Sequence, residues 1–191
     1  MRIKLEKSGI RALGISESFK KERGKKSVIG GVVMRSDLII DGIIFGETTL
    51  EGDDATDTII DIFEGLKRND INVIILSGAI ISLYNIIDIN RIGQETGIPI
   101  ICVTFEKSDG LEETIKHHFP EKWGKKIGEY KKLDIRELID LKTGYKIYAR
   151  THGLDIKKAK KVLDKFTLQG AVPEPVRLAR LLAKAKLKAT H

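Results

Sequence analysis

Residues 27–45 read SVIGGVVMRSDLIIDGIIF, and this stretch decides the predicted fold. It contains two runs rich in β-branched residues, 27–35 and 38–45, separated by two polar residues. Such runs joined by a short turn predict a pair of antiparallel strands. The preceding residues 10–16 (IRALGIS) have the same character. We therefore expect a three-stranded antiparallel meander at the start of the chain.

Further strands and helices are predicted after the meander. Asp53 or Asp54 is placed to cap a helix whose apolar residues recur at helical spacing. Residues 72–77 (NVIILS) and 100–105 (IICVTF) are continuous apolar runs, which are typical of parallel strands buried on both faces. Between them we expect a helix over 84–96 that ends at a glycine. This part of the chain therefore predicts parallel strand–helix–strand units.

The C-terminal part is predicted to be mainly helical. The expected elements are a short helix from about Asp109 to about His118, an irregular basic segment over 119–133, a helix near 134–142, a strand over 144–150, a helix over 156–168 capped by Asp155, and a final helix from Pro173 to about Leu187. Three antiparallel strands followed by strand–helix units is the order of the ribonuclease H-like fold. We therefore expect residues 1–191 to form a single α/β domain of this class, with a mixed sheet and a helical C-terminal part.

In a sheet of this order the first strand lies beside the fourth, and the two are parallel. Their carboxyl ends then meet at one edge, which is the usual place for a site in open α/β sheets. The residues expected there are 14–18 and 76–78. Ser16, Glu17 and Ser77 are thus candidates for a functional site.

Five short motifs lie between about Ile10 and Ala185. They are residues 14–17 (GISE), 51–57 (EGDDATD), 76–78 (LSG), 84–89 (YNIIDI) and 173–179 (PEPVRLA). Together they resemble the archaeal endonuclease-dU family, which is related to endonuclease V. The resemblance implies a ribonuclease H-like fold and divalent-metal-dependent cleavage of DNA beside deaminated bases such as deoxyuridine, as in DNA repair.

The resemblance also assigns positions to the cleavage site. In the wider family, carboxylates at the tips of the first and fourth strands bind the metal, and the matching residues here are Ser16 and Ser77. A further position, Asp or His in the family, is Arg180. Serine hydroxyls are neutral and poor metal ligands, so we expect any metal site to be weakened.

Four carboxylates remain near the expected site: Glu17, Asp53, Asp54 and Asp57. We expect them to carry catalysis if the chain is active, with Glu17, Asp53 and Asp57 holding Mg²⁺ or Mn²⁺. Glu17 replaces the lost ligand only where the strand has ended or bulged, because successive strand residues face opposite ways. The alternative role of Asp53 or Asp54 is capping, and Asp57 is favoured by the helix dipole alone.

Basic residues on the last two predicted helices form one-sided stripes. The candidates for phosphate contacts are Lys157, Lys161, Lys165, Arg177, Arg180 and Lys184. Trp123 lies among lysines and is a candidate for stacking on an unpaired base. The alternatives are that the stripes are solvated faces, that Trp123 anchors its segment on the core, and that Arg177 pairs with Glu174.

Charge is distributed unevenly along the chain. Residues 1–36 carry a net charge of +7, residues 37–114 carry −12 and residues 115–191 carry +12, giving +7 in total. A basic surface around an acidic middle favours a protein that meets polyanions. The resemblance implies DNA as that partner, with RNA as a further possibility. The alternative is the ion-pair networks of a thermophilic protein.

The composition excludes several other classes. No apolar run approaches the roughly 20 residues of a membrane span, and Cys102 is the sole cysteine, so no internal disulfide forms. We expect a cytoplasmic, endonuclease V-like hydrolase, which if active is a Mg²⁺-dependent endodeoxyribonuclease. The alternative, motivated by Ser16, Ser77 and Arg180, is a catalytically inactive nucleic-acid-binding descendant that needs no cofactor. A protein-interaction scaffold is a weaker alternative.

Overall fold

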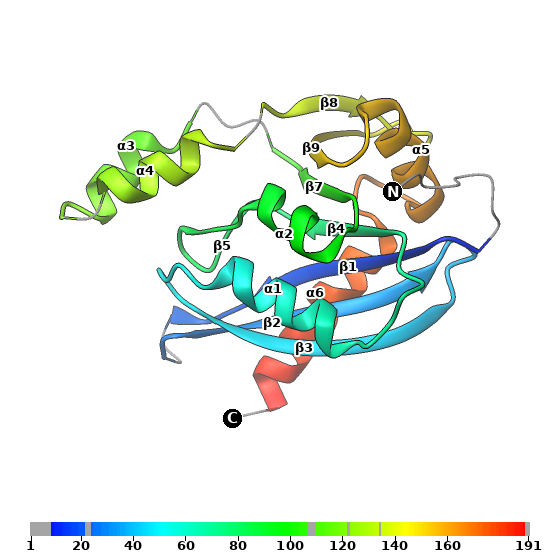
Figure 1. Ribbon diagram of the computed structural model, residues 1–191, viewed down its shortest axis with the longest axis horizontal. Helices are drawn as coiled ribbons and strands as arrows, with labels where there is room; N and C mark the ends of the chain where they lie inside the picture. Colours follow the sequence, from blue (N-terminus) through cyan, green and yellow to red (C-terminus); the bar gives the residue numbers. More distant parts are fainter. Residues whose placement is uncertain (1–8, 22–23, 107–109, 122, 134, 190–191) are drawn as a thin grey trace.

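The computed structural model describes residues 9–21, 24–106, 110–121, 123–133 and 135–189. Its centre is a seven-stranded mixed sheet with helices on both faces (Figure 1). In order across the sheet, the strands are β3 (Ile40–Thr49), β2 (Lys26–Arg35), β1 (Arg11–Ser18), β4 (Val73–Ser77), β7 (Ile100–Thr104), β9 (Lys146–His152) and β8 (Glu137–Asp140). A separate hairpin consists of β5 (Ile80–Ile81) and β6 (Asn85–Ile86). The helices are α1 (Ala55–Gly65), α2 (Ile89–Thr96), α3 (Glu112–His118), α4 (Trp123–Lys131), α5 (Ile156–Phe166) and α6 (Glu174–Ala189).

The pairing of the strands confirms the predicted fold class. β1, β2 and β3 form the antiparallel meander, whereas β1 pairs with β4, and β4 with β7, in parallel. β1 thus lies between the meander and the parallel strands, which is the ribonuclease H-like order. The β1–β4 register aligns Ile15 with Leu76, so the C-terminal ends of these two strands are neighbours. None of the described helices has the length and apolar composition of a membrane span.

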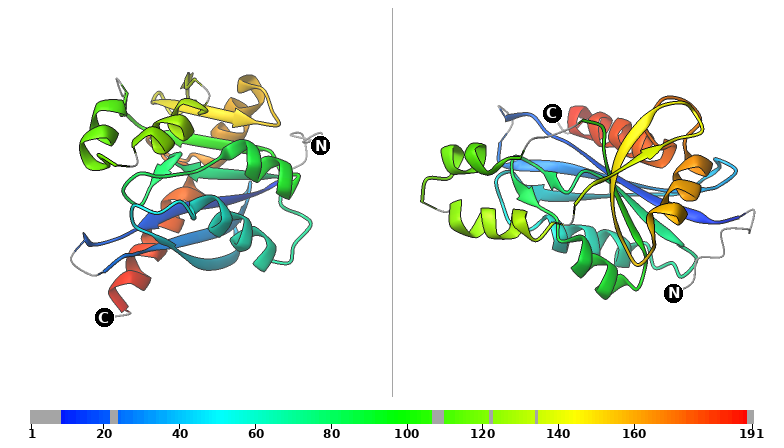
Figure 2. Two further views of the ribbon diagram at one scale, coloured as in Figure 1. Left: turned by 60° about the vertical axis from the view of Figure 1, so that its left-hand side comes forward. Right: turned by 90° about the horizontal axis from the view of Figure 1, so that it is seen from above.

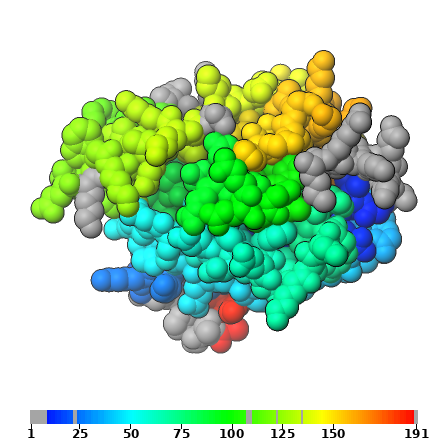
Figure 3. Space-filling model, in the orientation of Figure 1, coloured from blue at the N-terminus to red at the C-terminus, as the bar shows by residue number. Residues whose placement is uncertain are grey.

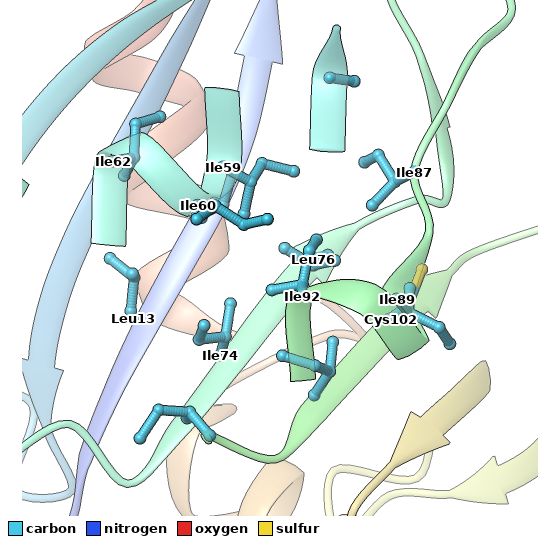
Figure 4. Packing of buried hydrophobic residues seen from close by; sticks show 14 of the residues in the cluster. Leu13, Ile59, Ile60, Ile62, Ile74, Leu76, Ile87, Ile89, Ile92 and Cys102 are labelled. Carbon is cyan, nitrogen blue, oxygen red and sulfur yellow. The ribbon is translucent and has the colours of Figure 1, made fainter. Parts of the chain in front are cut away.

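Two apolar clusters hold the helices on opposite faces of the sheet. On one face α1 and α2 cover Leu13, Ile74 and Leu76, which Figure 4 shows in close packing. On the other face α5 and α6 cover Ala12 and Ile75. Figure 2 shows the same division of the helices from two further sides. We call the side of the sheet covered by α1 and α2 the α1 face, and the side covered by α5 and α6 the α6 face. Because side chains alternate along a strand, each residue of β1 and β4 can be assigned to one of these two faces.

The helix predicted over 84–96 begins later, at Ile89. The Asp88 side chain caps α2 by accepting hydrogen bonds from N–H groups of its first turn. A capping residue has non-helical backbone, so the helix cannot extend back through it. Residues 80–86 instead form the β5–β6 hairpin, whose tip, residues 82–84, has positive φ at three successive positions.

Two predictions for the segment after α3 are wrong. The segment 119–133, predicted to be irregular, contains α4, and residues within 134–142 form strand β8 rather than a helix. In β8 only Ile139 is buried, and it joins the apolar cluster under α5. Pairing with β9 and burial of Ile139 under α5 outweigh the local helical preference. The capping residue expected at Asp109 lies outside the described residues, and α3 begins at Glu112.

Two glycines allow α6 to lie directly on the sheet. A Cβ atom on Gly14 would stand 2.6 Å from the Cβ of Pro175, and one on Gly30 would overlap the carbonyl oxygen of Ala179. Both approaches are too close for any side chain, so only glycine fits at these two positions. The 173–179 motif is thereby fixed beside the C-terminal end of β1.

Gly14→Ala should lower the free energy of unfolding by about 1–3 kcal/mol, because the added methyl group displaces α6. Urea denaturation followed by circular dichroism measures this. Gly128→Ala on α4 is the control, because a Cβ there meets no atom within 4 Å. It should leave stability unchanged or raise it by up to about 1 kcal/mol through helix propensity. Wild-type stability of Gly14→Ala would contradict the close contact.

Candidate functional site

Ser16 and Ser77 lie side by side at the C-terminal ends of β1 and β4, on the α6 face. They follow the aligned pair Ile15 and Leu76. Gly14 faces α6, and residues two apart along a strand share a face, so Ser16 faces α6 as well. Ser16 is 6% exposed, and neither serine hydroxyl has a hydrogen-bond partner among the described residues. An open groove of about 260 Å³ is lined by Ser77, Gly78, Val103, Thr104, Phe105 and Glu106, and Ser16 is not part of its wall.

Arg180 lies on α6, one turn after Val176. Val176 packs in the buried cluster that contains Ile75 of β4. Of these two residues only Val176 is buried, so the Arg180 side chain lies outside this cluster. Arg180 is exposed and makes no ion pair within the described part of the chain. Arg177 differs, because it pairs with Glu174, which was one of the predicted alternatives.

Glu17 faces the opposite side of the sheet from Ser16. β1 pairs regularly with β2 as far as Ser18, with no bulge at its end. Both carboxylate oxygens of Glu17 lie 2.8 Å from the backbone nitrogen of Ser82, and Oε2 also accepts a hydrogen bond from Ser27 Oγ at 2.9 Å. The condition under which Glu17 would replace the ligand lost at Ser16 is therefore not met. Glu17 instead fixes the β5–β6 hairpin on the α1 face.

Asp54 and Asn85 form a polar network between β3, α1 and β6. The Asp54 carboxylate accepts hydrogen bonds from Thr49 N–H at 3.0 Å, from Thr49 Oγ1 at 2.7 Å and from Asn85 Nδ2 at 2.7 Å. Asn85 Oδ1 accepts the N–H of Ala55, the first residue of α1, at 3.0 Å. Asp54 stands at the N-cap position but its side chain makes no capping hydrogen bond. The predicted capping by Asp53 or Asp54 is thus wrong, and Asn85 serves instead.

The surroundings of Asp54 keep it ionised. Burial of the carboxyl group opposes ionisation, but hydrogen bonds from Thr48, Thr49 and Asn85 outweigh it and hold the pKa of Asp54 well below its usual range. A carboxylate saturated with donors has little capacity to take up a proton or to bind an ion. Its contacts join the end of β3 to the start of α1.

Asp53 and Asp57 are each paired with cations. Asp53 Oδ2 lies 2.7 Å from Lys125 Nζ, and Asp53 Oδ1 lies 2.8 Å from Lys126 Nζ. Hydrogen bonds from Lys125 and then Lys126 lower the pKa of Asp53 below its ordinary value. Asp57 Oδ1 lies 2.7 Å from a guanidinium nitrogen of Arg91. Both carboxylates are therefore neutralised by the chain itself.

The predicted carboxylates do not come together as a metal site. Glu17 is bound by serines, Asp53 by lysines and Asp57 by an arginine. Within the residues that the structure describes, no group of three or more Asp, Glu, His or Cys is arranged to hold a metal ion. The residues expected to bind Mg²⁺ or Mn²⁺ thus do not fit such an ion in this arrangement.

The predicted nucleic-acid contacts divide between two parts of the molecule. Lys157, Lys161 and Lys184 are exposed on α5 and α6, and Lys165 is half-buried. Both helices cover the face on which Ser16 and Ser77 lie. Trp123 is 45% exposed on α4, and Lys116 Nζ lies 5.8 Å from its ring centroid. The α3–α4 hairpin projects at one end of the molecule, away from α5 (Figures 1 and 3).

A pocket of about 510 Å³ separates this hairpin from the first turns of α1 and α2. Ile87, Asp88 and Arg91 line it on one side, and Glu129 and Lys132 line it on the other. Because its walls carry charges of both signs above an apolar floor, it suits a small polar molecule better than an extended apolar one.

Three residues that organise this region were not predicted: Ser82, Asn85 and Lys126. The available signal for Asn85 was an amide inside the otherwise apolar 84–89 motif. Lys126 is one of a run of lysines, and nothing in the local pattern marks it as the buried one. Ser82 binds Glu17 across 65 positions of sequence, which no local pattern reports.

Proteins of known sequence and structure resemble this chain over most of its length. A UPF0215 protein from Pyrobaculum calidifontis is 36% identical over 172 residues, which cover 90% of this chain and 93% of that protein. The crystal structure of a protein of unknown function from Archaeoglobus fulgidus is 29% identical, with a TM-score of 0.77, and the match covers 93% and 98% of the two chains.

The fold is also similar to that of endonuclease V. The Ciona intestinalis enzyme, crystallised with a 24mer DNA that contains an inosine followed by a ribo-adenosine, has a TM-score of 0.64. It is 14% identical, and the match covers 96% of this chain and 88% of that one. At this level of identity the likeness concerns the fold alone, and it agrees with the ribonuclease H-like strand order.

Asp54→Asn should lower the free energy of unfolding at pH 7 by roughly 1.5–3 kcal/mol, because charge-assisted hydrogen bonds are lost. The folded-state pKa of Asp54 is depressed, so its contribution is complete above the unfolded value near 4 and is lost as pH falls towards the folded value. The difference between wild type and variant, measured by urea denaturation, should therefore shrink below about pH 4. Asp61→Asn, on the exposed side of α1, is the control and should leave the free energy of unfolding at pH 7 within about 0.5 kcal/mol of wild type. A constant Asp54→Asn difference from pH 7 to pH 2 would contradict this account.

The sequence family described as endonuclease dU matches residues 8–187, which is nearly the whole chain. The match includes all five motifs on which the predicted resemblance rests, and the observed strand order agrees with it. This chain belongs to the endonuclease dU family.

Proposed function

We propose that this chain acts on nucleic acid as an endonuclease of the dU type, cleaving DNA near deaminated bases such as deoxyuridine. The observation that carries the proposal is the family match over residues 8–187. The likeness in fold to an endonuclease V crystallised with inosine-containing DNA supports it. The distribution of basic residues is consistent with a polyanionic partner.

We expect the nucleic acid to lie across the C-terminal ends of β1, β4 and β7. The hydroxyl of Ser77 is a donor at this edge, and the groove that it lines is open. A phosphate that lies there would accept a hydrogen bond from Ser77, and the exposed cation Arg180 on α6 would attract it. The exposed lysines of α5 and α6 extend the positive surface on the same face, which favours long-range attraction of a phosphate backbone.

We assign no step of the cleavage to a metal ion. Glu17, Asp53 and Asp57 were the residues predicted to hold Mg²⁺ or Mn²⁺, and each has another partner. Residues on this chain contribute to the reaction by binding and orienting the backbone at the β1–β4 edge. The proposed contacts with the phosphate backbone include no divalent ion, and the cleavage assay is therefore run both with and without such ions.

Incubation with a labelled duplex that contains one deoxyuridine should yield a discrete nick near that base, because the family match implies recognition of a deaminated base. The reaction is resolved on denaturing gels, with Mg²⁺, with Mn²⁺ and with EDTA, at several temperatures. The undamaged duplex of the same sequence is the control. Absence of nicking by folded protein, under all conditions and with inosine as well as deoxyuridine, would contradict cleavage.

A second candidate function is nucleic-acid binding without cleavage. The specific observation in its favour is the pair of neutral hydroxyls, Ser16 and Ser77, where the family has carboxylates, with Arg180 at a third family position. A cationic and neutral edge attracts a phosphate without activating water. The nicking assay and the binding experiment below together separate the two functions.

Arg180→Ala should weaken binding to DNA and reduce the dependence of log Kd on log salt concentration by about one, because one phosphate contact is lost. Fluorescence anisotropy over a range of NaCl concentrations measures both quantities. Lys67→Asn is the control, because it removes one charge beyond the C-terminal end of α1, and Asn tolerates the positive φ found there. Equal affinity and salt dependence for Arg180→Ala and wild type would contradict the proposed contact.

A further inference from the structure

Lys126 is a buried cation whose surroundings are complete. Its side chain is 4% exposed, although lysine is seldom buried unless paired. The ammonium lies 2.8 Å from Asp53 Oδ1, 2.9 Å from the carbonyl oxygen of Gly52 and 3.0 Å from the carbonyl oxygen of Tyr84. An ammonium group has three N–H donors, and here three oxygens accept them. The face of Phe119 lies 5.2 Å from Nζ and adds a favourable cation–π contact.

The three oxygens form a cradle for one positive charge. We name Asp53 Oδ1 and the carbonyl oxygens of Gly52 and Tyr84 the Asp53 cradle. One carboxylate and two carbonyls are the kinds of oxygen that bind hard cations in proteins. All three come from the body of the domain, whereas Lys126 comes from α4. The cation is therefore supplied by a different element from the one that binds it.

The Asp53 cradle lies where the sequence predicted a metal ligand. Two of its oxygens, those of Gly52 and Asp53, lie in the connection that precedes α1, within the 51–57 motif, where a metal-binding carboxylate was predicted. The third comes from Tyr84, between β5 and β6. We infer that the Lys126 ammonium is a built-in cation that fills the Asp53 cradle in place of a divalent metal ion and fastens the α3–α4 hairpin to the domain. Lys125 neutralises the second oxygen of Asp53. The inference is independent of whether the chain cleaves nucleic acid.

The fastening has a visible consequence for the hairpin. α3 and α4 contact each other, and α4 contacts the body next to β6 (Figures 1 and 2). Tyr84 supplies both a cradle oxygen and a ring that packs edge-on against Phe119, with 5.6 Å between centroids. Glu129 of α4, with Lys132 and Leu133 just after the helix, also forms one wall of the 510 Å³ pocket. The position of that wall therefore depends on the contact between Lys126 and Asp53.

Hydrogen exchange of the full-length chain tests the fastening. In Asp53→Asn, amides of residues 123–131 should exchange at least tenfold faster than in wild type, because the buried ammonium loses its charged partner. Asp57→Asn is the matched control. It also removes one carboxylate charge, about one helical turn from Asp53, but Asp57 pairs with Arg91 and not with a lysine of α4. Its exchange over 123–131 should equal that of wild type. Unchanged exchange in Asp53→Asn would overturn the inference.

Binding of Mn²⁺, followed by loss of the free-ion electron paramagnetic resonance signal, tests the cation position. Wild type and Asp53→Asn should bind Mn²⁺ equally weakly, because Lys126 already fills the cradle in wild type. The double variant Lys125→Met/Lys126→Met should gain Mn²⁺ binding, at least tenfold tighter than wild type, and Asp53→Asn in that background should abolish the gain. Lys131→Met, on the same helix, is the control and should behave as wild type. Wild-type binding that depends on Asp53, or no gain in the folded double variant, would overturn the inference.

Discussion

The left-handed turn at residues 82–84 is the constraint on which this end of the molecule depends. Three successive non-glycine residues with positive φ cost on the order of 1 kcal/mol or more each, so other contacts must hold them. The Glu17 carboxylate accepts the N–H of the first residue, and Lys126 donates to the carbonyl oxygen of the last. The turn, held by these two contacts, positions Asn85, whose side chain caps α1. The sheet, the first helix and the α3–α4 hairpin are all joined through this one turn.

The acidic residues of the sequence acquire a different meaning from this arrangement. Glu17, Asp53 and Asp54 are three of the four carboxylates that were predicted to carry catalysis, and each of these three connects elements of the fold. The candidate phosphate contacts lie on the opposite face, at Ser16 and Ser77. The sheet thus separates the carboxylates that connect these elements from the two serines at the β1–β4 edge.

Much of the fold could be predicted from the sequence because its signals are local. β-branched runs, apolar spacing and the capping residue Asp155 are each recorded in a few neighbouring residues, and they correspond to strands and helices that the structure contains. β8 could not be predicted because its character comes from pairing with β9 and from burial of Ile139, both of which depend on distant parts of the chain. The helix over 84–96 was placed too early because the cost of the left-handed turn is met by Glu17, 65 residues before Ser82.

The candidate site was predictable in place but not in detail. Parallel pairing of β1 and β4 brings Ser16 and Ser77 together, and that pairing follows from the order of elements. The side of the sheet on which Glu17 lies depends on whether β1 ends before it. Because β1 pairs regularly with β2 as far as Ser18, Glu17 lies on the opposite face from Ser16. The partners of Asp53 come from α4, a helix that local sequence did not indicate. Neutralisation of a carboxylate by a distant lysine is a tertiary property, and it alters the chemistry of the site more than any motif does.

We propose that this chain meets nucleic acid at the β1–β4 edge while Lys126 occupies the cation position at Asp53. A crystal structure of the chain with deoxyuridine-containing DNA and Mn²⁺, with anomalous data to locate the ion, tests both contacts at once. We expect the phosphate backbone beside Ser16, Ser77 and Arg180, Lys126 still bound to Asp53, and no anomalous peak at the Asp53 cradle. A peak that bridges Glu17 and Asp53, with Lys126 displaced, would contradict this proposal.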